Sequence, residues 1–202
     1  LICIISVPIV LSLNQGFKSN VISKITHFDG YARIYKDNLN INDSFIINNQ
    51  FDYNLNRFIE LDAIIKNQSL SEGVKLISLD RPRLFVDDFI INTFPNNNDG
   101  LFIGIDLYNK LFSNQPSEHS AFILLGENKV AQVTIIGIFD TGIPYYDSHI
   151  VLLNNEYLNN RFLIDDFDGY IFTENEYVRL DKQFDDKINT YEDRYFNFIQ
   201  WL

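Results

Sequence analysis

Histidine and cysteine are the residues of this chain that could ligate a metal or activate a nucleophile. The three histidines, His27, His119 and His149, lie far apart, and their spacing matches no metal-binding motif. The single cysteine, Cys3, lies in an apolar N-terminal run, so the chain has no pair for a disulfide or a thiolate site. We therefore predict no metal centre and no cofactor.

Adjacent carboxylates occur at 87–88, 165–166 and 185–186. Neighbouring side chains in a strand or loop point apart, so these pairs indicate a solvated acidic surface and not an acid–base pair. The glycines form neither a G-x-G-x-x-G fingerprint nor a phosphate-binding loop, and no serine lies in a G-x-S-x-G turn. We predict that the chain has no catalytic residues and is not an enzyme.

The charge balance narrows the range of partners. The net charge is −11, and 46% of the residues are hydrophobic, a composition typical of a folded domain. A chain this acidic, with no basic patch, does not bind nucleic acid by neutralising phosphates. Negative charge also disfavours docking onto an anionic membrane surface.

The stretch 133–153 has the pattern of two strands joined by a sharp turn. Residues 133–139 are β-branched and aromatic, and 150–153 form a second apolar run. We expect 139–147 to form the turn between paired strands. Four residues of that turn are our candidate partner contacts, although their aromatic rings could instead fold back onto the core of the domain. They are Ile143, Pro144, Tyr145 and Tyr146.

The N-terminal run 1–13 is almost wholly apolar, and no charge precedes Lys18. We interpret residues 1–15 as the end of a transmembrane helix continuous with a helix over 14–25. A signal-peptide core, a lipoprotein anchor at Cys3 and a buried core helix are the alternatives. Because the chain lacks Met altogether, we expect it to be a fragment or a processed form.

The remaining elements are short strands with few helices. We expect strands at 30–36, 44–47, 58–65, 72–79, 121–125, 130–139 and 169–172, and a strand followed by a helix within 101–112. A helix is expected at 178–188, a loop at 162–168, and turns at 94–100 and 126–129. The elements do not alternate regularly, so the predicted fold class is α+β.

Several segments resemble the extracytoplasmic domain of the LolC/LolE branch of ABC transporter permeases, relatives of MacB and FtsX. The sharpest is G-I-F-x-T-G-x-x-x-Y-D at 137–147. Similar matches are N-Q-G-F at 14–17, E-G-V-x-L at 72–76, and E-x-R followed by F-x-x-W-L at the C-terminus. The last match implies an amphipathic helix over 192–202.

The resemblance implies a two-lobed periplasmic domain. A Porter-like lobe would comprise 16–80 and 166–202, and a Sabre-like lobe would comprise 81–165. The helix that the family carries between 36 and 60 is expected to be short or absent here. The hairpin turn at 126–129 is too short for the protruding Hook of LolC-type members, so the resemblance does not extend to capture of a periplasmic carrier.

The resemblance also implies the function. The chain would lie mostly in the periplasm at the bacterial inner membrane and couple ATP-driven motion to the extraction of lipoproteins. ATP hydrolysis would be supplied by a separate ABC ATPase subunit, and a second permease subunit, identical or different, would complete the transporter. A MacB-like or FtsX-like permease for another substrate, and a membrane-tethered binding domain unrelated to transport, are the alternatives.

Overall fold

The computed structural model describes residues 2–51, 55–68, 70–94, 99–113, 119–126 and 129–201; for 2–11 and 201 the description covers the backbone alone. The chain forms two compact units, one made of 1–53 and 171–202 and the other of 54–170. Helices and strands follow one another without regular alternation, which confirms the predicted α+β class.

The first unit is formed by the two ends of the chain, and it contains most of the helical residues. Its elements are α1 (Ile2–Phe28), β1 (Ala32–Tyr35), η1 (Lys36–Asn38), α2 (Ile41–Gln50), α7 (Glu174–Arg179), η3 (Lys182–Lys187), β10 (Ile188–Thr190), α8 (Tyr191–Arg194) and α9 (Phe196–Trp201). β1 pairs with β10 in antiparallel register, with Ala32 opposite Thr190. Two segments from opposite ends of the sequence are therefore neighbouring strands.

Helix α1 runs without a break from Ile2 to Phe28, which confirms that the apolar run continues directly into 14–25. The chain then turns at Gly30, whose φ of +74° is accessible mainly to glycine. A Cβ there would lie 2.4 Å from Cγ1 of Ile171, so no larger residue fits. Within the described residues, no helix carries an apolar stretch long enough to cross a membrane, and the transmembrane assignment of 1–15 stays a prediction.

Helix α2 corrects one prediction. The strand predicted at 44–47 is wrong, because these residues lie in α2. The helix expected to be short or absent between 36 and 60 is present, with ten residues. Asn40 accepts a hydrogen bond from the backbone N–H of Asp43, and the Asp43 carboxylate accepts one from the N–H of Asn40. This capping box begins a helix upstream of the β-branched residues, whose local strand preference is weaker.

The C-terminal segments also differ from the predicted long helices. The predicted helix at 178–188 is wrong, because α7 begins earlier at a capping box between Thr173 and Glu176, and a 3₁₀ segment, η3, follows it. The predicted helix at 192–202 is two short helices, α8 and α9. Tyr195 separates them because its backbone (φ −115°, ψ 18°) leaves the helical region.

The second unit is built on strands. They are β2 (Asn56–Asn67), β3 (Leu70–Leu79), β4 (Ile90–Thr93), β5 (Leu101–Gly104), β6 (Ser120–Leu125), β7 (Lys129–Phe139) and β8 (Ile150–Asn154), and β9 (Gly169–Phe172) begins at its end. Its helical segments are α3 (Arg83–Val86), η2 (Asp87–Phe89), α4 (Ile105–Phe112), α5 (Pro144–His149) and α6 (Asn155–Phe162).

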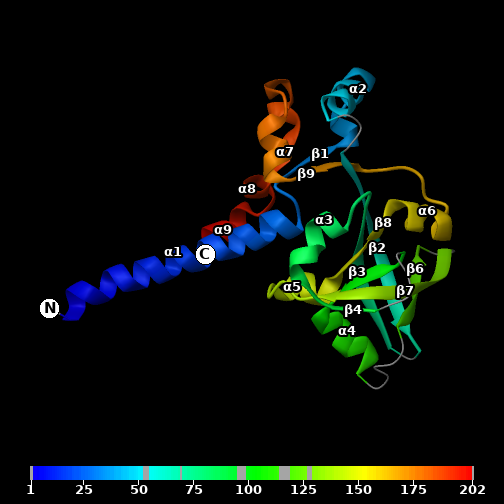
Figure 1. Cartoon of the computed structure of the whole chain (residues 1–202), viewed down its shortest axis with the longest axis horizontal. Helices are drawn as coiled ribbons and strands as arrows, with labels where there is room; N and C mark the ends of the chain where they lie inside the picture. The colour runs from blue at the N-terminus through cyan, green and yellow to red at the C-terminus, as the bar shows by residue number, and fades with distance from the viewer. Residues whose placement is uncertain are drawn as a thin grey trace. The chain divides into compact units, whose positions relative to one another are not determined.

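The hydrogen-bonded order of these strands closes on itself. From β2 it runs through β3, β8, β5, β7 and β6 back to β2. Strand β4 is added beside β7, as Figure 1 shows. Closure pairs every strand of the ring on both sides and removes exposed edges from it. We call this ring the barrel. Alternate residues of its strands, such as Ile65 and Ile123, are buried with side chains of α4 and α6 in one core.

The strands predicted at 58–65, 72–79, 121–125 and 130–139, and the strand followed by a helix at 101–112, are confirmed. The expected pairing of the two strands within 133–153 is wrong. β5 lies between β7 and β8, and the intervening turn contains α5, where Pro144 supplies the preset φ of a first helical turn.

The lobes proposed from the resemblance stay a prediction. The structure does show that residues 54–80, placed with the first lobe, belong to the same compact unit as 81–170. The reason is the ten-residue ladder between β2 and β3, which makes them walls of the barrel. Parts of the turns expected at 94–100 and 126–129 lie outside the described residues.

Candidate functional site

The four predicted contact residues do not form one exposed surface. Tyr145 is 54% exposed and Pro144 is also exposed, whereas Ile143 is half-buried and Tyr146 is 3% exposed. Consecutive residues of α5 point in different directions, so one tyrosine faces solvent and the other packs inside. Tyr146 is therefore corrected from surface to core, and partner contact through the remaining three stays a prediction.

A buried carboxylate, Asp147, holds the segment before α5 in place. Its Oδ1 accepts hydrogen bonds from the backbone N–H and the hydroxyl of Thr141, both at 2.8 Å. Burial raises the pKa of Asp147 above its ordinary value, although these hydrogen bonds favour the charged form. Gly104 passes so close that a Cβ would lie 2.3 Å from the carbonyl oxygen of Asp147.

The first unit contains a denser charged cluster around Asp29, just after α1. Its Oδ1 accepts a hydrogen bond from Nη2 of Arg33 at 2.5 Å, and its Oδ2 accepts from Nη1 of Arg194 at 2.9 Å. The hydroxyl of Tyr195 donates to the same Oδ2 at 2.6 Å. We call these four residues the Asp29 clasp.

Three further contacts strengthen the link between α1 and the C-terminal helices. Arg194 also donates to the backbone carbonyls of Asp29 (3.1 Å) and Gly30 (2.6 Å). Nearer the N-terminus, Nζ of Lys18 donates to the carbonyl of Ile199 at 3.1 Å, and Figure 1 shows α9 beside α1. Charge-assisted bonds of this kind are about twice as strong as neutral ones. These bonds therefore tie α1 to α8 and α9.

Sequence reasoning did not find the clasp. The spacing of Asp29 and Arg33 was visible as an i, i+4 pair. Arg194 and Tyr195, however, lie 165 and 166 residues away from Asp29, and no local pattern connects them to it.

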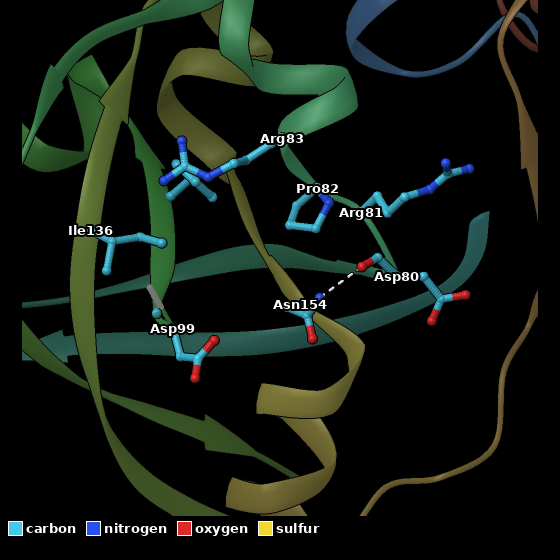
Figure 2. Close-up of a pocket in the computed structure, with 9 residues that line it drawn as sticks. Asp80, Arg81, Pro82, Arg83, Asp99, Ile136 and Asn154 are labelled. Atoms are coloured by element: carbon cyan, nitrogen blue, oxygen red, sulfur yellow. Dashed lines mark hydrogen bonds between the residues drawn. The ribbon is translucent and has the colours of Figure 1, made fainter. Parts of the chain in front are cut away.

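The second unit contains an open cavity of about 240 Å³ (Figure 2). Its lining combines the charged residues Asp80, Arg81, Arg83 and Asp99 with the apolar Phe102 and Ile136. Figure 2 shows Arg81 and Arg83 leading away from Pro82 in opposite directions. The guanidinium of Arg83 lies 5.5 Å from the centre of the Phe102 ring, a cation–π distance.

The Asp80 carboxylate at the rim of this cavity is occupied by its own neighbours. Nε and Nη2 of Arg57 donate to its two oxygens at 3.0 and 3.1 Å, and the amide of Asn155 donates at 2.9 Å. Burial would raise the pKa of Asp80, but these hydrogen bonds outweigh it and lower the pKa. The carboxylate is thus held ionised as a structural tie between β2, β3 and α6.

The histidines lie in three separate settings. His149 stacks on Tyr145, His119 stacks on Phe94, and His27 is near the end of α1. In the part of the chain that the structure describes, no three histidine, cysteine or acidic side chains are grouped so that they could hold a metal ion.

Comparison with known proteins shows a similar fold but assigns the chain to no family. No family model matches the chain. No curated protein matches it either. The periplasmic region of MacB from Actinobacillus actinomycetemcomitans aligns with 84% of this chain and 91% of its own length, at 8% identity and a TM-score of 0.50. The extracellular domain of the noncanonical ABC-type transporter YknZ from Gram-positive bacteria aligns over 77% and 78%, at 11% identity and a TM-score of 0.48.

The structural neighbours are thus extracytoplasmic domains of ABC transporters of the MacB and YknZ type. At such low identity the likeness to the MacB region is one of fold. The chain has the α+β fold of that periplasmic region.

Proposed function

We propose that this chain is the extracytoplasmic domain of an ABC transporter permease. The observation that carries the proposal is the fold likeness to the periplasmic region of MacB, which extends over 84% of the chain. Fold alone does not fix function, so the proposal also rests on a site whose geometry suits a transporter domain.

The Asp29 clasp suits a domain that transmits motion. It ties the end of a helix that starts in an uncharged N-terminal run to the last two helices of the chain. If both ends continue into membrane helices, the clasp couples their movements to one another. Rigid-body motion of a domain pulled by its membrane helices is a common form of conformational coupling.

On this proposal the chain does no chemistry itself. A separate ABC ATPase subunit hydrolyses ATP, and a second permease subunit completes the transporter. The domain would face the periplasm from the bacterial inner membrane, and no nucleic acid is involved, consistent with the net charge of −11.

For the cargo we propose lipoproteins extracted from the inner membrane. The support is the resemblance of 137–147 to the lipoprotein-releasing branch, in a segment held by the buried Asp147. A periplasmic carrier is a further partner of such a transporter, but the short hairpin turn at 126–129 argues against its capture by this chain. The second candidate is a MacB-like permease for another substrate, which the fold likeness to MacB favours.

The test is purification of the transporter that contains this chain, followed by an assay of ATP-driven cargo release. We expect the full-length protein to copurify from membranes with an ABC ATPase and to release a lipoprotein from proteoliposomes when ATP is added. Asp29→Asn should lower cargo release while the ATPase subunit stays bound, because the clasp is weakened and the subunit contact is not. Purification without any ATPase would contradict the permease proposal, and ATP-driven release of a non-lipoprotein substrate would favour the second candidate.

A further inference from the structure

The outside of the barrel carries an apolar row where β2, β6 and β7 meet. Strand register places Ile64 opposite Leu124, and Leu124 opposite Val130. Residues directly opposite one another project from the same face, with Cβ atoms about 5 Å apart. Phe122 lies two residues from Leu124 on β6 and so shares that face. We call Ile64, Phe122, Leu124 and Val130 the outer patch.

The outer patch is open to solvent. Ile64 is 47% exposed, Phe122 46% and Val130 59%, while the intervening Ile65 and Ile123 are fully buried in the barrel. An antiparallel strand with one face on a core ordinarily carries polar residues on the other. A Cβ added to Gly73, which lies opposite Ile64, would meet no atom within 4 Å, so this side of the row is also uncovered among the described residues.

The charges on β2 are arranged symmetrically about the centre of the patch. Asp62 and Lys66 lie two residues before and two residues after Ile64, so all three project from the same face. Asp62 is in a surface ion pair with Lys75 at 2.8 Å. Lys66 lies opposite Phe122 at the other end. An acid, an apolar centre and a base thus follow one another along a single strand.

Such an order is complementary to itself. Consider a two-fold axis that lies in the plane between two copies of the chain, runs perpendicular to β2 and passes beside Ile64. Rotation about this axis brings Ile64 of one copy against Ile64 of the other. The same rotation places Lys66 of one chain over Asp62 of the other, twice. Self-complementarity of this kind is what a two-fold dimer interface requires. Sheets packed face to face lie about 10 Å apart, a gap that an extended lysine and an aspartate can span.

We propose that the outer patch is the docking surface for a second copy of this chain. The second copy would be the second permease subunit of the proposed transporter, and in that respect the inference rests on the proposed function. Four apolar side chains make a small contact, so the association is weak in solution. Tethering both copies in one membrane raises their effective concentration and makes a weak contact sufficient.

Sedimentation of the full chain in detergent over a range of concentrations tests the proposal. We expect a reversible monomer–dimer equilibrium whose Kd rises at least tenfold in Ile64→Asp and in Lys66→Asp. The matched control is Leu163→Asp, in the same unit and 85% exposed, which lies outside the patch and should leave Kd unchanged. Circular dichroism melts of each variant show whether it is folded. The control also separates the patch from association through the apolar N-terminal run.

Cross-linking tests the two-fold geometry itself. In a Cys3→Ser background, chains carrying Asp62→Cys are mixed with chains carrying Lys66→Cys and treated with a short bismaleimide. The expected result is a high yield of the mixed 62–66 product and a low yield from either variant alone. Equal yields in all three samples would overturn the proposed axis.

Two outcomes would overturn the docking surface. One is a chain that stays monomeric at every concentration, and the other is a dimer whose Kd changes equally in Ile64→Asp and Leu163→Asp. Because no ATPase is present in these measurements, they are independent of the transport assay. If the chain is monomeric but still supports ATP-driven release, the proposed docking surface is excluded and the proposed function is retained.

Discussion

Asp29 and Arg194 are 165 residues apart in the chain, yet their side chains meet at 2.9 Å. Both are largely buried, and the same carboxylate also binds Arg33 at 2.5 Å. Removal of a buried carboxylate shared by two guanidiniums would leave both of them uncompensated. This pairing makes the two ends of the first unit one mechanical element.

Replacing the shared carboxylate should therefore be costly. We expect Asp29→Asn to lower the free energy of unfolding by about 3 kcal/mol, because breaking a buried ion pair leaves an uncompensated charge. Urea denaturation followed by circular dichroism measures this change. Asp87→Asn is the control, since the exposed Arg83–Asp87 pair at 3.5 Å should contribute little. Equal effects of the two substitutions would show that the clasp is not a stabilising element.

The Asp80 ion pair should give stability that depends on pH. The pKa of Asp80 is lowered in the folded state, so its contribution is fully present above the unfolded pKa of about 3.9 and is lost as the pH falls through the folded value. We expect Asp80→Asn to destabilise the chain clearly at pH 7 and much less near pH 3. Thermal melts of both proteins across this range provide the measurement. A penalty that stays constant with pH would contradict the ion-pair role.

The stability that Asp147 contributes should change with pH in the opposite direction. Burial raises the pKa of its carboxyl, so the folded state favours the protonated form, and the stability this gives is lost as the pH rises through the folded pKa. Asp147→Asn retains an oxygen that can accept from Thr141 and carries no charge. The variant should therefore gain stability relative to the wild type as the pH rises from 4 to 7. A relative loss over that interval would mean that the hydrogen bonds outweigh burial.

The close approach of Gly104 to Asp147 predicts a strong effect of a single methyl group. Gly104→Ala places a Cβ 2.3 Å from a backbone oxygen, and we expect it to cost about 2 kcal/mol or more. Gly73→Ala is the matched control, because its Cβ would meet nothing within 4 Å. Similar melting temperatures for the two variants would show that the backbone near Asp147 can move aside.

The predictions from sequence succeeded where the pattern is local. The β-branched and alternating runs identified β2, β3, β6 and β7, because strand preference and alternate burial are both visible in short windows. They failed for α2, where the capping box of Asn40 and Asp43 outweighs the following strand-like residues.

Pairings between segments that are distant in the sequence could not be predicted from such local patterns. The parallel pairing of β5 with β7, the insertion of β5 between β7 and β8, and the closure of β6 onto β2 depend on contacts between distant segments. The Asp29 clasp is of the same kind. For Tyr145 and Tyr146, the sequence placed two rings on a turn, but only the helical geometry of α5 decides which one is buried.

Substitutions of the two tyrosines of α5 should distinguish contact with a partner from stability of the fold. Tyr146 is buried, so Tyr146→Ala should cost about 3 kcal/mol of stability through the cavity that it leaves. Tyr145 is exposed, so Tyr145→Ala should leave the melting temperature nearly unchanged. If the exposed ring contacts a partner, Tyr145→Ala will lower ATP-driven cargo release by the full transporter at unchanged stability. Transport equal to that of the wild type in this stable variant would exclude Tyr145 as a contact residue.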